Sequence, residues 1–328
     1  MKKKLKDIYK TLIGPESGSE RDFYLSEKID HNTEIYVGVS PNNEPTLLIH
    51  SVEEDYRLQK SIQDFTGVSI EFYKECFIKD EETSSRNFYN VIIYKKDDPS
   101  LRNFFFDFFE DFFVANSEIN GQILVQEINN LIELFSLRRK ASRQKMMGLW
   151  SELFILKCSY NKDLWAEKWH DGERSTFDFR FPSIGVDVKS FSGNKREHFF
   201  KLEQLSNDSV REQLILSICL TENDTGQNVF ELFEDIKKDI VSKKLIKKIQ
   251  KQVFKNSGDK ADDLKRYDES IARETLCLIN SKDIPRIKET PPIGVTEIKF
   301  KSDCSNAKNV PFNDDIQLSI ENDKYNNK

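Results

Sequence analysis

The sequence predicts a protein of mixed α and β structure, an α/β fold in the looser sense, from three observations. Residues 33–96 show the period-two alternation of apolar side chains that is typical of antiparallel strands. Aromatic side chains then recur at helical spacing between residues 104 and 113. From residue 143 onward, the patterns predict a helix, three short strands, a helix and a strand.

Length and composition exclude several classes of protein. A chain of 328 residues corresponds to about two domains. Apolar residues make up 38% and there are 25 Phe, so a sizeable core can form and intrinsic disorder is excluded as the main state. No run approaches the roughly 18 apolar residues of a membrane span. The basic start at residues 1–6 lacks the apolar segment of a secretory signal, so we expect a cytoplasmic protein with no membrane partner.

Cysteine and histidine patterns argue against two kinds of metal or redox site. The five cysteines lie far apart with no C-x-x-C pair, which excludes a zinc ribbon and a thioredoxin-like motif. The four histidines have no spacing typical of a shared metal ligand set. His170 and Asp171 are expected in a polar loop between strands rather than at a metal.

The first predicted domain, residues 1–116, combines a small antiparallel sheet with a helix. Two hairpins are expected, with strands at 35–39, 46–50, 68–77 and 87–96. The helix follows from two neighbouring series of Phe side chains at a spacing of four, since such residues share a helix face. A connecting helix is expected at residues 117–140.

The second predicted domain, residues 141–225, carries the α/β pattern. Its first helix is expected at 143–160 and its second near 199–205. The expected strands are 165–169, 176–181, 185–190 and 214–220. A C-terminal extension, residues 226–320, should contain a long basic helix at about 229–255 and strand-like runs at 274–279 and 294–301. The polar tail, residues 321–328, is expected to be disordered.

Two of the expected strands place charged side chains together. In the first, Asp178 and Arg180 alternate with Phe residues, and in the second Asp187 and Lys189 alternate with Val residues. A four-residue turn at 182–185 would set Asp178 opposite Lys189 and Arg180 opposite Asp187, at about 4.5–5.5 Å. For Arg180, a salt bridge to Asp187 and a contact with phosphate stay equally open.

Two carboxylates and a lysine on one side of a hairpin suit phosphodiester hydrolysis. Carboxylate oxygens are preferred ligands of Mg²⁺, with Mn²⁺ as a substitute. The metal lowers the pKa of bound water, and the lysine orients that water or stabilises the charged transition state. Glu152 is a third candidate ligand, because it lies in an otherwise apolar run and an unpaired buried carboxylate is costly. The alternatives are a solvated strand face with ordinary ion pairs and, for Glu152, a salt bridge to Lys157 or Arg143.

The motifs around these residues resemble those of a known superfamily. They are Gly148-Leu149-Trp150-Ser151-Glu152-Leu153, Trp169, Phe177-Asp178-Phe179, Val186-Asp187-Val188-Lys189-Ser190 and Leu202-Glu203-Gln204-Leu205. They are similar to those of PD-(D/E)XK nucleases, and more closely to the bacterial "PD-(D/E)XK motif proteins" once classed as a domain of unknown function. Two departures are Phe177 where the superfamily often has Pro, and Asp187 where many relatives have Glu.

The resemblance implies a restriction-endonuclease-like αβββαβ core with Asp178, Asp187, Lys189 and Glu152 as its site. Asp178, Asp187 and Glu152 would be the metal ligands, and Gln204 and Arg180 accessory residues. It also implies a Mg²⁺-dependent DNA endonuclease of a bacterial restriction or anti-phage system, with a methyltransferase and an ATPase as partners. The alternatives are a catalytically inactive subunit that binds DNA or a partner, and a repair or RNA-processing nuclease.

Charge locates a candidate DNA contact away from these motifs. The net charge of −6 gives the whole chain no electrostatic reason to hold nucleic acid. Residues 235–266, however, hold 11 basic and 5 acidic side chains. Lys243, Lys244, Lys247 and Lys248 are the candidate contacts to a DNA backbone, against the alternative of a solvated amphipathic helix. Double-strand cleavage requires two active sites, so a homodimer or a partner complex is expected.

Overall fold

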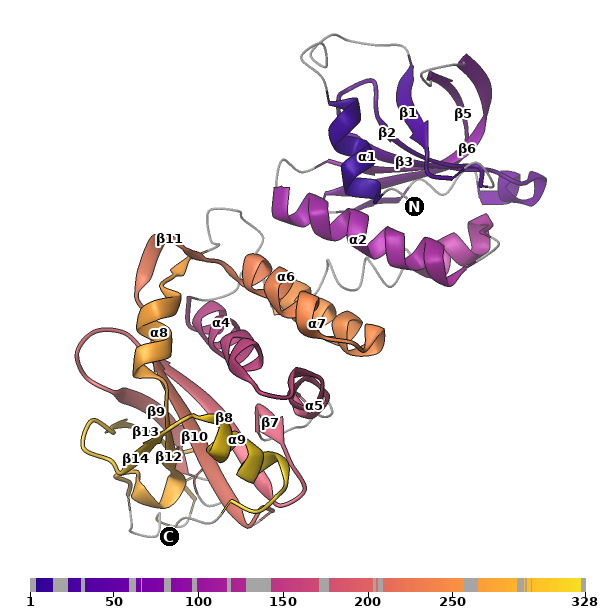
Figure 1. Ribbon diagram of the computed structural model, residues 1–328. Coiled ribbons are helices and arrows are strands. Elements are labelled where there is room, and N and C mark those ends of the chain that lie inside the picture. The colour runs from indigo at the N-terminus through magenta and orange to yellow at the C-terminus, as the bar shows by residue number, and fades with distance from the viewer. Residues whose placement is uncertain are drawn as a thin grey trace. The chain divides into compact units, whose positions relative to one another are not determined.

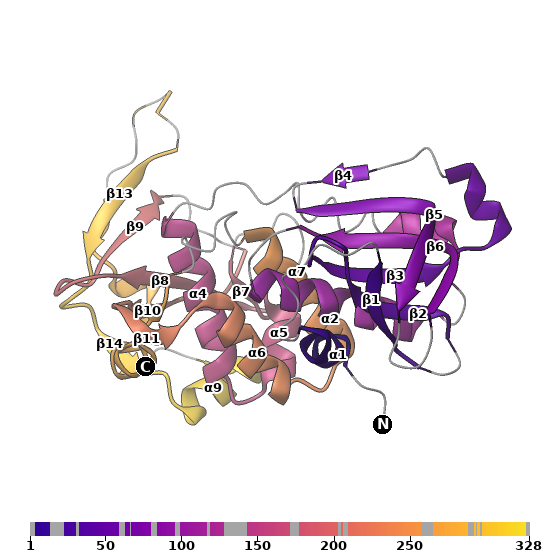
Figure 2. The same cartoon turned by 90° about the horizontal axis from the view of Figure 1, so that it is seen from above.

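The chain forms two units, residues 1–136 and 137–328. This is a computed structural model, shown in Figures 1 and 2. It describes residues 4–13, 23–30, 33–58, 63–65, 67–79, 84–95, 99–116, 119–127, 143–170, 177–202, 205, 209–256, 265–287, 292, 294, 295 and 297–325. The division falls inside the predicted connecting segment 117–140. Residues from the predicted C-terminal extension share the second unit with the predicted core.

A six-stranded sheet in the order β1-β2-β3-β6-β5-β4 forms the first unit. Its strands are β1 (Tyr24–Lys28), β2 (Ile35–Val39), β3 (Pro45–His50), β4 (Gln63–Phe65), β5 (Val68–Lys79) and β6 (Ser84–Tyr94). Both predicted hairpins are confirmed, β2 with β3 and β5 with β6. Because β1 pairs with β2 on one side and with β5 on the other, the sheet closes on itself.

Helices α1 (Leu5–Leu12) and α2 (Pro99–Ala115) belong to this unit. The Phe series predicted α2, and Phe105, Phe106 and Phe109 have no exposed surface. A helical segment follows at residues 121–127, and the rest of the predicted helix at 117–140 lies outside the described residues. The 3₁₀ helix η1 (Glu53–Leu58) carries the buried Asp55, which accepts hydrogen bonds from Gly121 N at 2.7 Å and Asn90 Nδ2 at 2.7 Å.

The second unit is built on a five-stranded sheet in the order β14-β12-β10-β8-β7. Its strands are β7 (Phe179–Arg180), β8 (Ile184–Phe191), β10 (Glu212–Cys219), β12 (Cys277–Asn280) and β14 (Asn309–Pro311). Strands β8 and β10 run parallel, and the other pairs are antiparallel. A separate two-stranded ribbon joins β9 (Glu197–Lys201) to β13 (Lys299–Asp303).

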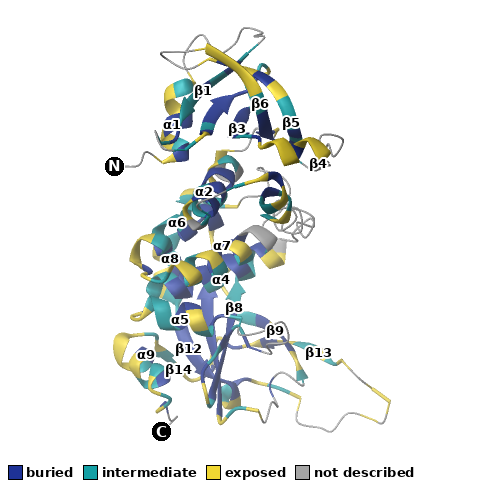
Figure 3. Cartoon of the chain, turned by 90° about the vertical axis from the view of Figure 1, so that its right-hand side faces the viewer, coloured by how far each residue is buried: buried dark blue, intermediate teal, exposed yellow. Residues whose placement is uncertain are grey.

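Helices gather on one side of this sheet, as Figure 3 shows for α4, α6 and α7. The helices are α4 (Arg143–Cys158), α5 (Lys162–Lys168), α6 (Val229–Asp239), α7 (Lys243–Asn256), α8 (Glu269–Thr275) and α9 (Asp314–Glu321). The remaining elements are β11 (Glu222–Gln227) and the 3₁₀ helix η4 (Ser281–Asp283). Trp150 of α4 is fully buried and stacks on Phe154. None of the described helices is long and apolar enough to cross a membrane.

Three predicted elements differ in the structure. The predicted strand at 165–169 is helix α5, because Asn161 caps its first turn by accepting from Leu164 N at 3.1 Å. The predicted helix near 199–205 begins as strand β9, and residues 203, 204 and 206–208 lie outside the described part. The long basic helix divides into α6 and α7, since Asp163 accepts from the backbone N–H groups of Val241 and Ser242.

Residues 321–325 of the tail predicted to be disordered are ordered, and residues 326–328 lie outside the described part. Glu321 is the last residue of helix α9, residues 322–325 follow it, and Tyr325 is 7% exposed. Strands β12 and β13 overlap the predicted runs at 274–279 and 294–301, but α8 occupies the beginning of the first run. The mixed α and β fold class predicted from the sequence is confirmed.

Candidate active site

The hairpin of β7 and β8 is tighter than the sequence suggested. Phe181 N donates to Ile184 O at 2.9 Å, so two residues, Pro182 and Ser183, form the turn. The register pairs Phe179 with Val186 and Arg180 with Gly185. The predicted pairing across a four-residue turn is therefore wrong by two residues.

Residues late in the sequence of the second unit form hydrogen bonds to this turn. Ser183 donates to the Asp323 carboxylate through its backbone N at 3.0 Å and its hydroxyl at 2.7 Å. Arg211 Nη2 donates to Asp323 O at 3.0 Å and to Tyr325 O at 3.3 Å. These contacts explain why residues 323–325 are ordered.

Arg180 does not bridge to Asp187 as one reading of the sequence expected. Its Nη1 donates to Ser209 Oγ at 3.1 Å and its Nη2 to Ser209 O at 2.7 Å. The new register places Arg180 opposite Gly185, which explains why its side chain turns to the loop before β10. The salt-bridge prediction is wrong.

Asp178 is anchored at one oxygen. Its Oδ2 accepts from Val188 N at 2.7 Å, and no described residue hydrogen-bonds to Oδ1. Burial of the carboxyl group, followed by the negative charges of Glu152 and Asp187, raises the pKa of Asp178 well above its usual range. The Val188 N–H and Lys189 oppose that rise but do not cancel it. In the metal-free protein, a proton therefore competes for this carboxyl group.

Glu152 reaches the same place from α4. Its Oε2 accepts from Trp169 Nε1 at 2.8 Å and lies 2.8 Å from His170 Nε2. No described residue hydrogen-bonds to Oε1, and the side chain is 14% exposed. The predicted alternative, a salt bridge to Lys157, is not formed, because Lys157 Nζ bonds to Asp235 and Glu269. Arg143's side chain lies outside the described atoms.

His170 is part of the site, although the sequence predicted a polar loop residue rather than a metal ligand. Its φ of 43° lies in the left-handed region, which is strained for a residue with a side chain. The backbone N of His170 donates to Asp178 O at 2.9 Å, which ties this turn to the start of β7. Asp171 lies outside the described residues. No local sequence motif predicts the place of His170 in the site, because its position depends on the isolated β-bridge between Trp169 and Phe179.

Glu152, His170 and Asp178 each offer a ligand atom within 4.8 Å of the other two. Ligands bonded at about 2.0–2.3 Å to one ion can lie up to about 4.5 Å apart, so the three fit one divalent cation with a small adjustment. Each carboxylate also has one anchored oxygen and one without a hydrogen bond among the described atoms. The donor set therefore fits a metal.

Asp187 and Lys189 lie beside this cluster on β8. Asp187 is 2% exposed and its Oδ2 lies 3.4 Å from Gln213 Nε2, a long hydrogen bond. Its charge raises the pKa of Asp178, but it is not among the three residues with closely spaced ligand atoms. Lys189 follows two residues later on the same side of the strand. Its Nζ lies 5.9 Å from the ring centroid of Phe200.

The remaining candidate residues lie elsewhere. Gln204 is outside the described part of the chain. Lys243, Lys244 and Lys247 are exposed on α7. Lys248 is a structural residue rather than a free DNA contact, because its Nζ donates to Ala166 O at 3.1 Å and Glu167 O at 2.8 Å and so satisfies the end of α5.

The fold and the acidic cluster together define a nuclease-like domain of restriction-endonuclease-like, mixed α and β architecture. The chain belongs to the family described as "Putative PD-(D/E)XK family member, (DUF4420)", whose model matches residues 5–305. The predicted superfamily is thereby confirmed, and nucleases of this superfamily generally use divalent metals. Neither the curated proteins nor the solved structures contain a match to this chain.

Proposed function

We propose that this protein is a Mg²⁺- or Mn²⁺-dependent DNA endonuclease that acts in a bacterial restriction or anti-phage system. The observation that carries the proposal is the convergence of Glu152, His170 and Asp178, with Asp187 and Lys189 alongside, in a chain of the PD-(D/E)XK family. Clustered carboxylates repel one another, and a divalent cation relieves that repulsion.

Each residue has a distinct role in this proposal. Glu152 and Asp178 would hold the cation through the oxygens that have no hydrogen bond to a described residue, and the cation would supply Lewis-acid activation of water and phosphate. Trp169 orients Glu152 by donating to its Oε2, as residues behind a metal ligand commonly do. His170 is the third group within reach of the cation. Asp187 adds negative charge beside the site. Lys189 places a positive charge where the attacked phosphate gains negative charge.

The test is plasmid nicking by purified protein in Mg²⁺ or Mn²⁺. Glu152→Gln, Asp178→Asn, Asp187→Ala and Lys189→Ala should each lower the rate by at least about 100-fold, which corresponds to about 2.7 kcal/mol of transition-state stabilisation. Lys324→Ala, which removes an exposed lysine outside both α7 and the candidate site, should leave the rate unchanged. Thermal unfolding without metal should show that every variant is folded.

Two results would oppose the proposal. Undiminished nicking by Lys189→Ala would assign the activity to another protein in the preparation. A non-catalytic subunit would be favoured if the folded wild type binds Mn²⁺ but cuts neither DNA nor RNA. This result requires that any ATPase and methyltransferase encoded beside its gene are added to the assay. Cleavage of RNA alone would favour the RNA-processing alternative.

A further inference from the structure

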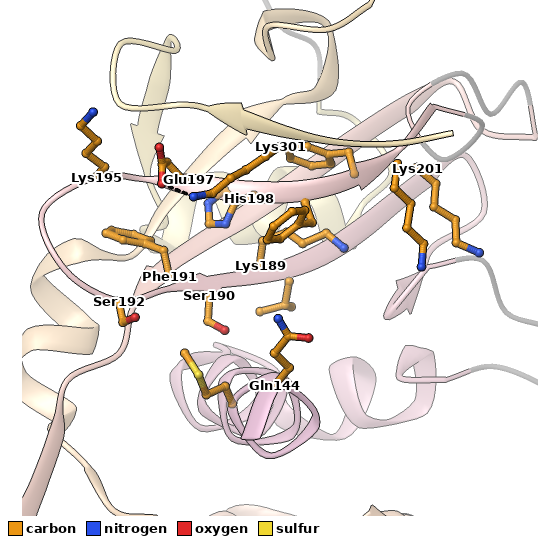
Figure 4. Close-up of a pocket in the computed structure, with 16 residues that line it drawn as sticks. Gln144, Lys189, Ser190, Phe191, Ser192, Lys195, Glu197, His198, Lys201 and Lys301 are labelled. Carbon is orange, nitrogen blue, oxygen red and sulfur yellow. Dashed lines mark hydrogen bonds and ion pairs between the residues drawn. The ribbon is translucent and has the colours of Figure 1, made fainter. Parts of the chain in front are cut away.

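An open groove of about 1150 Å³ lies beside the acidic cluster. Its walls are the beginning of α4, the second half of β8 and the β9–β13 ribbon. Figure 4 shows Gln144 of α4 on one side of Lys189 and the ribbon on the other. Of the candidate active-site residues, Lys189 lines this groove, together with Val188, whose backbone N donates to Asp178.

The groove is strongly basic in an acidic protein. Five lysines and one carboxylate line it, a net of +4, whereas the whole chain carries −6. Burial lowers the pKa of His198 to about 4, so this histidine is neutral at pH 7 and adds no charge. Lys301 forms an ion pair with Glu197. The other four lysines, Lys189, Lys195, Lys201 and Lys299, have no ion-pair partner among the described residues.

Two of these lysines lie directly opposite each other. Lys201 on β9 is the register partner of Lys299 on β13, and both side chains are exposed. Like charges at directly opposed positions destabilise a ribbon. A bound anion such as a phosphate would remove that cost.

An exposed aromatic ring lies on the same face of the ribbon. In the pleat of β9, Phe200 is buried, while the neighbouring Phe199 is 60% exposed. Phe199 is the register partner of Lys301, whose Nζ lies 5.9 Å from the centroid of its ring. Two residues further along β9 is Lys201. The exposed face thus places an aromatic ring beside unpaired lysines.

We propose that the β9–β13 ribbon binds single-stranded DNA, with phosphates at Lys201 and Lys299 and a base stacked on Phe199. Lysines and an aromatic platform are the combination that single-strand-binding surfaces use, since every base offers a π face. Bases inside a duplex are already stacked on one another and cannot cover Phe199. The binding of a single strand does not depend on the proposed function. The further statement that the bound strand reaches Lys189 and is cut there does rest on the proposed function.

The test measures binding without cleavage, by fluorescence anisotropy in EDTA. The probes are a labelled oligothymidylate of about 20 nucleotides and a duplex of the same length. Wild type should bind the single strand more tightly. Phe199→Ala should weaken that binding by about 10- to 100-fold and leave duplex binding unchanged, whereas Phe199→Trp should preserve both. The Lys201→Ala/Lys299→Ala variant should reduce the log–log salt slope of single-strand binding by about 1.4, or about 0.7 per phosphate.

The matched control is Lys10→Ala/Lys324→Ala, which removes the same charge from two exposed positions that are not candidate DNA contacts. It should bind both probes as wild type does. Tighter binding of the duplex, an unchanged affinity of Phe199→Ala for the single strand, or an equal loss in the Lys10→Ala/Lys324→Ala control would each overturn the inference. If Glu152→Gln and Lys189→Ala retain nicking while the ribbon variants lose single-strand binding, the proposed function fails and the binding surface stands.

Discussion

Replacing Asp178 by asparagine should stabilise the metal-free protein at neutral pH. The folded carboxyl group has a raised pKa, whereas the unfolded chain has the ordinary value of about 3.9. Between those two values, the folded state keeps a proton that the unfolded state has released. The contribution of this bound proton to the free energy of unfolding is fully present below the pKa of the unfolded chain. It is lost as the pH rises toward the pKa of Asp178 in the folded protein.

The size of the effect follows from one proton. Wild type should lose about 1.4 kcal/mol of unfolding free energy per pH unit across that interval relative to Asp178→Asn, which has no proton to exchange. For units of about 150–250 residues, this corresponds to about 3–5 °C in Tm per pH unit. The asparagine Oδ1 can still accept from Val188 N, so the hydrogen bond at 2.7 Å need not be lost.

The assay is thermal unfolding in EDTA at a series of pH values above 5, followed by tryptophan fluorescence. All 3 tryptophans, Trp150, Trp165 and Trp169, lie in the second unit, so the signal excludes the first unit. Asp235→Asn is the control with the opposite sign. Hydrogen bonds from Gln227 and Lys238 lower the pKa of Asp235, so that substitution should cost stability at neutral pH.

Parallel pH profiles for wild type and Asp178→Asn would refute this reasoning, because they would show that Asp178 is ionised in the metal-free fold. With Mn²⁺ added, the order should reverse, since only the carboxylate can hold the cation. Metal binding must then displace the proton, so the apparent affinity of wild type should rise by up to about tenfold per pH unit in the same interval.

Three further substitutions test the packing around the site. A Cβ at Gly185 would lie 2.6 Å from ring carbons of the buried Phe177, so Gly185→Ala should cost about 1–3 kcal/mol in chemical denaturation. Gly148→Ala, where the nearest atom is Glu152 Oε1 at 4.0 Å, should instead gain about 0.5–1 kcal/mol in the same assay, because alanine suits a helix interior better than glycine. Trp169→Phe removes a donor to Glu152 and should weaken Mn²⁺ binding by about 10- to 100-fold in a calorimetric titration; unchanged affinity would show that this hydrogen bond does not position the carboxylate.

The local alternation on β8 could be predicted from the sequence, but its surroundings could not. Val186 and Val188 on one side, and Asp187 and Lys189 on the other, follow from period two alone. The structure shows that Asp187 is buried as well, which argues against a solvated strand face. The side of β8 with Lys189 meets the ribbon of β9 and β13, and the sequence gives no sign that strands about 100 residues apart would pair there.

The incorrect predictions have two physical causes, an overlooked local signal for α5 and long-range contacts for the hairpin register and His170. Trp165 and Trp169 were assigned to a strand, although a spacing of four also suits a helix and Asn161 provides a starting cap. The sequence predicts the wrong hairpin register because the length of the turn depends on the hydrogen bond of Phe181 and on the hydrogen bond between Ser183 and the distant Asp323. His170 was missed for the same reason, since long-range contacts hold its left-handed turn.

The hydrogen bonds between Ser183 and Asp323 also bear on when this turn can complete its folding during protein synthesis. These two residues are 140 positions apart in the chain. At about 5–20 residues per second, a ribosome needs about 7–28 s to travel from one to the other. Throughout that interval, the turn between β7 and β8 lacks its two hydrogen bonds to Asp323, although the hydrogen bond from Phe181 N to Ile184 O can already form. We therefore expect the turn that follows Asp178 to gain its full set of hydrogen bonds only after the sheet and the helices of the second unit have been synthesised.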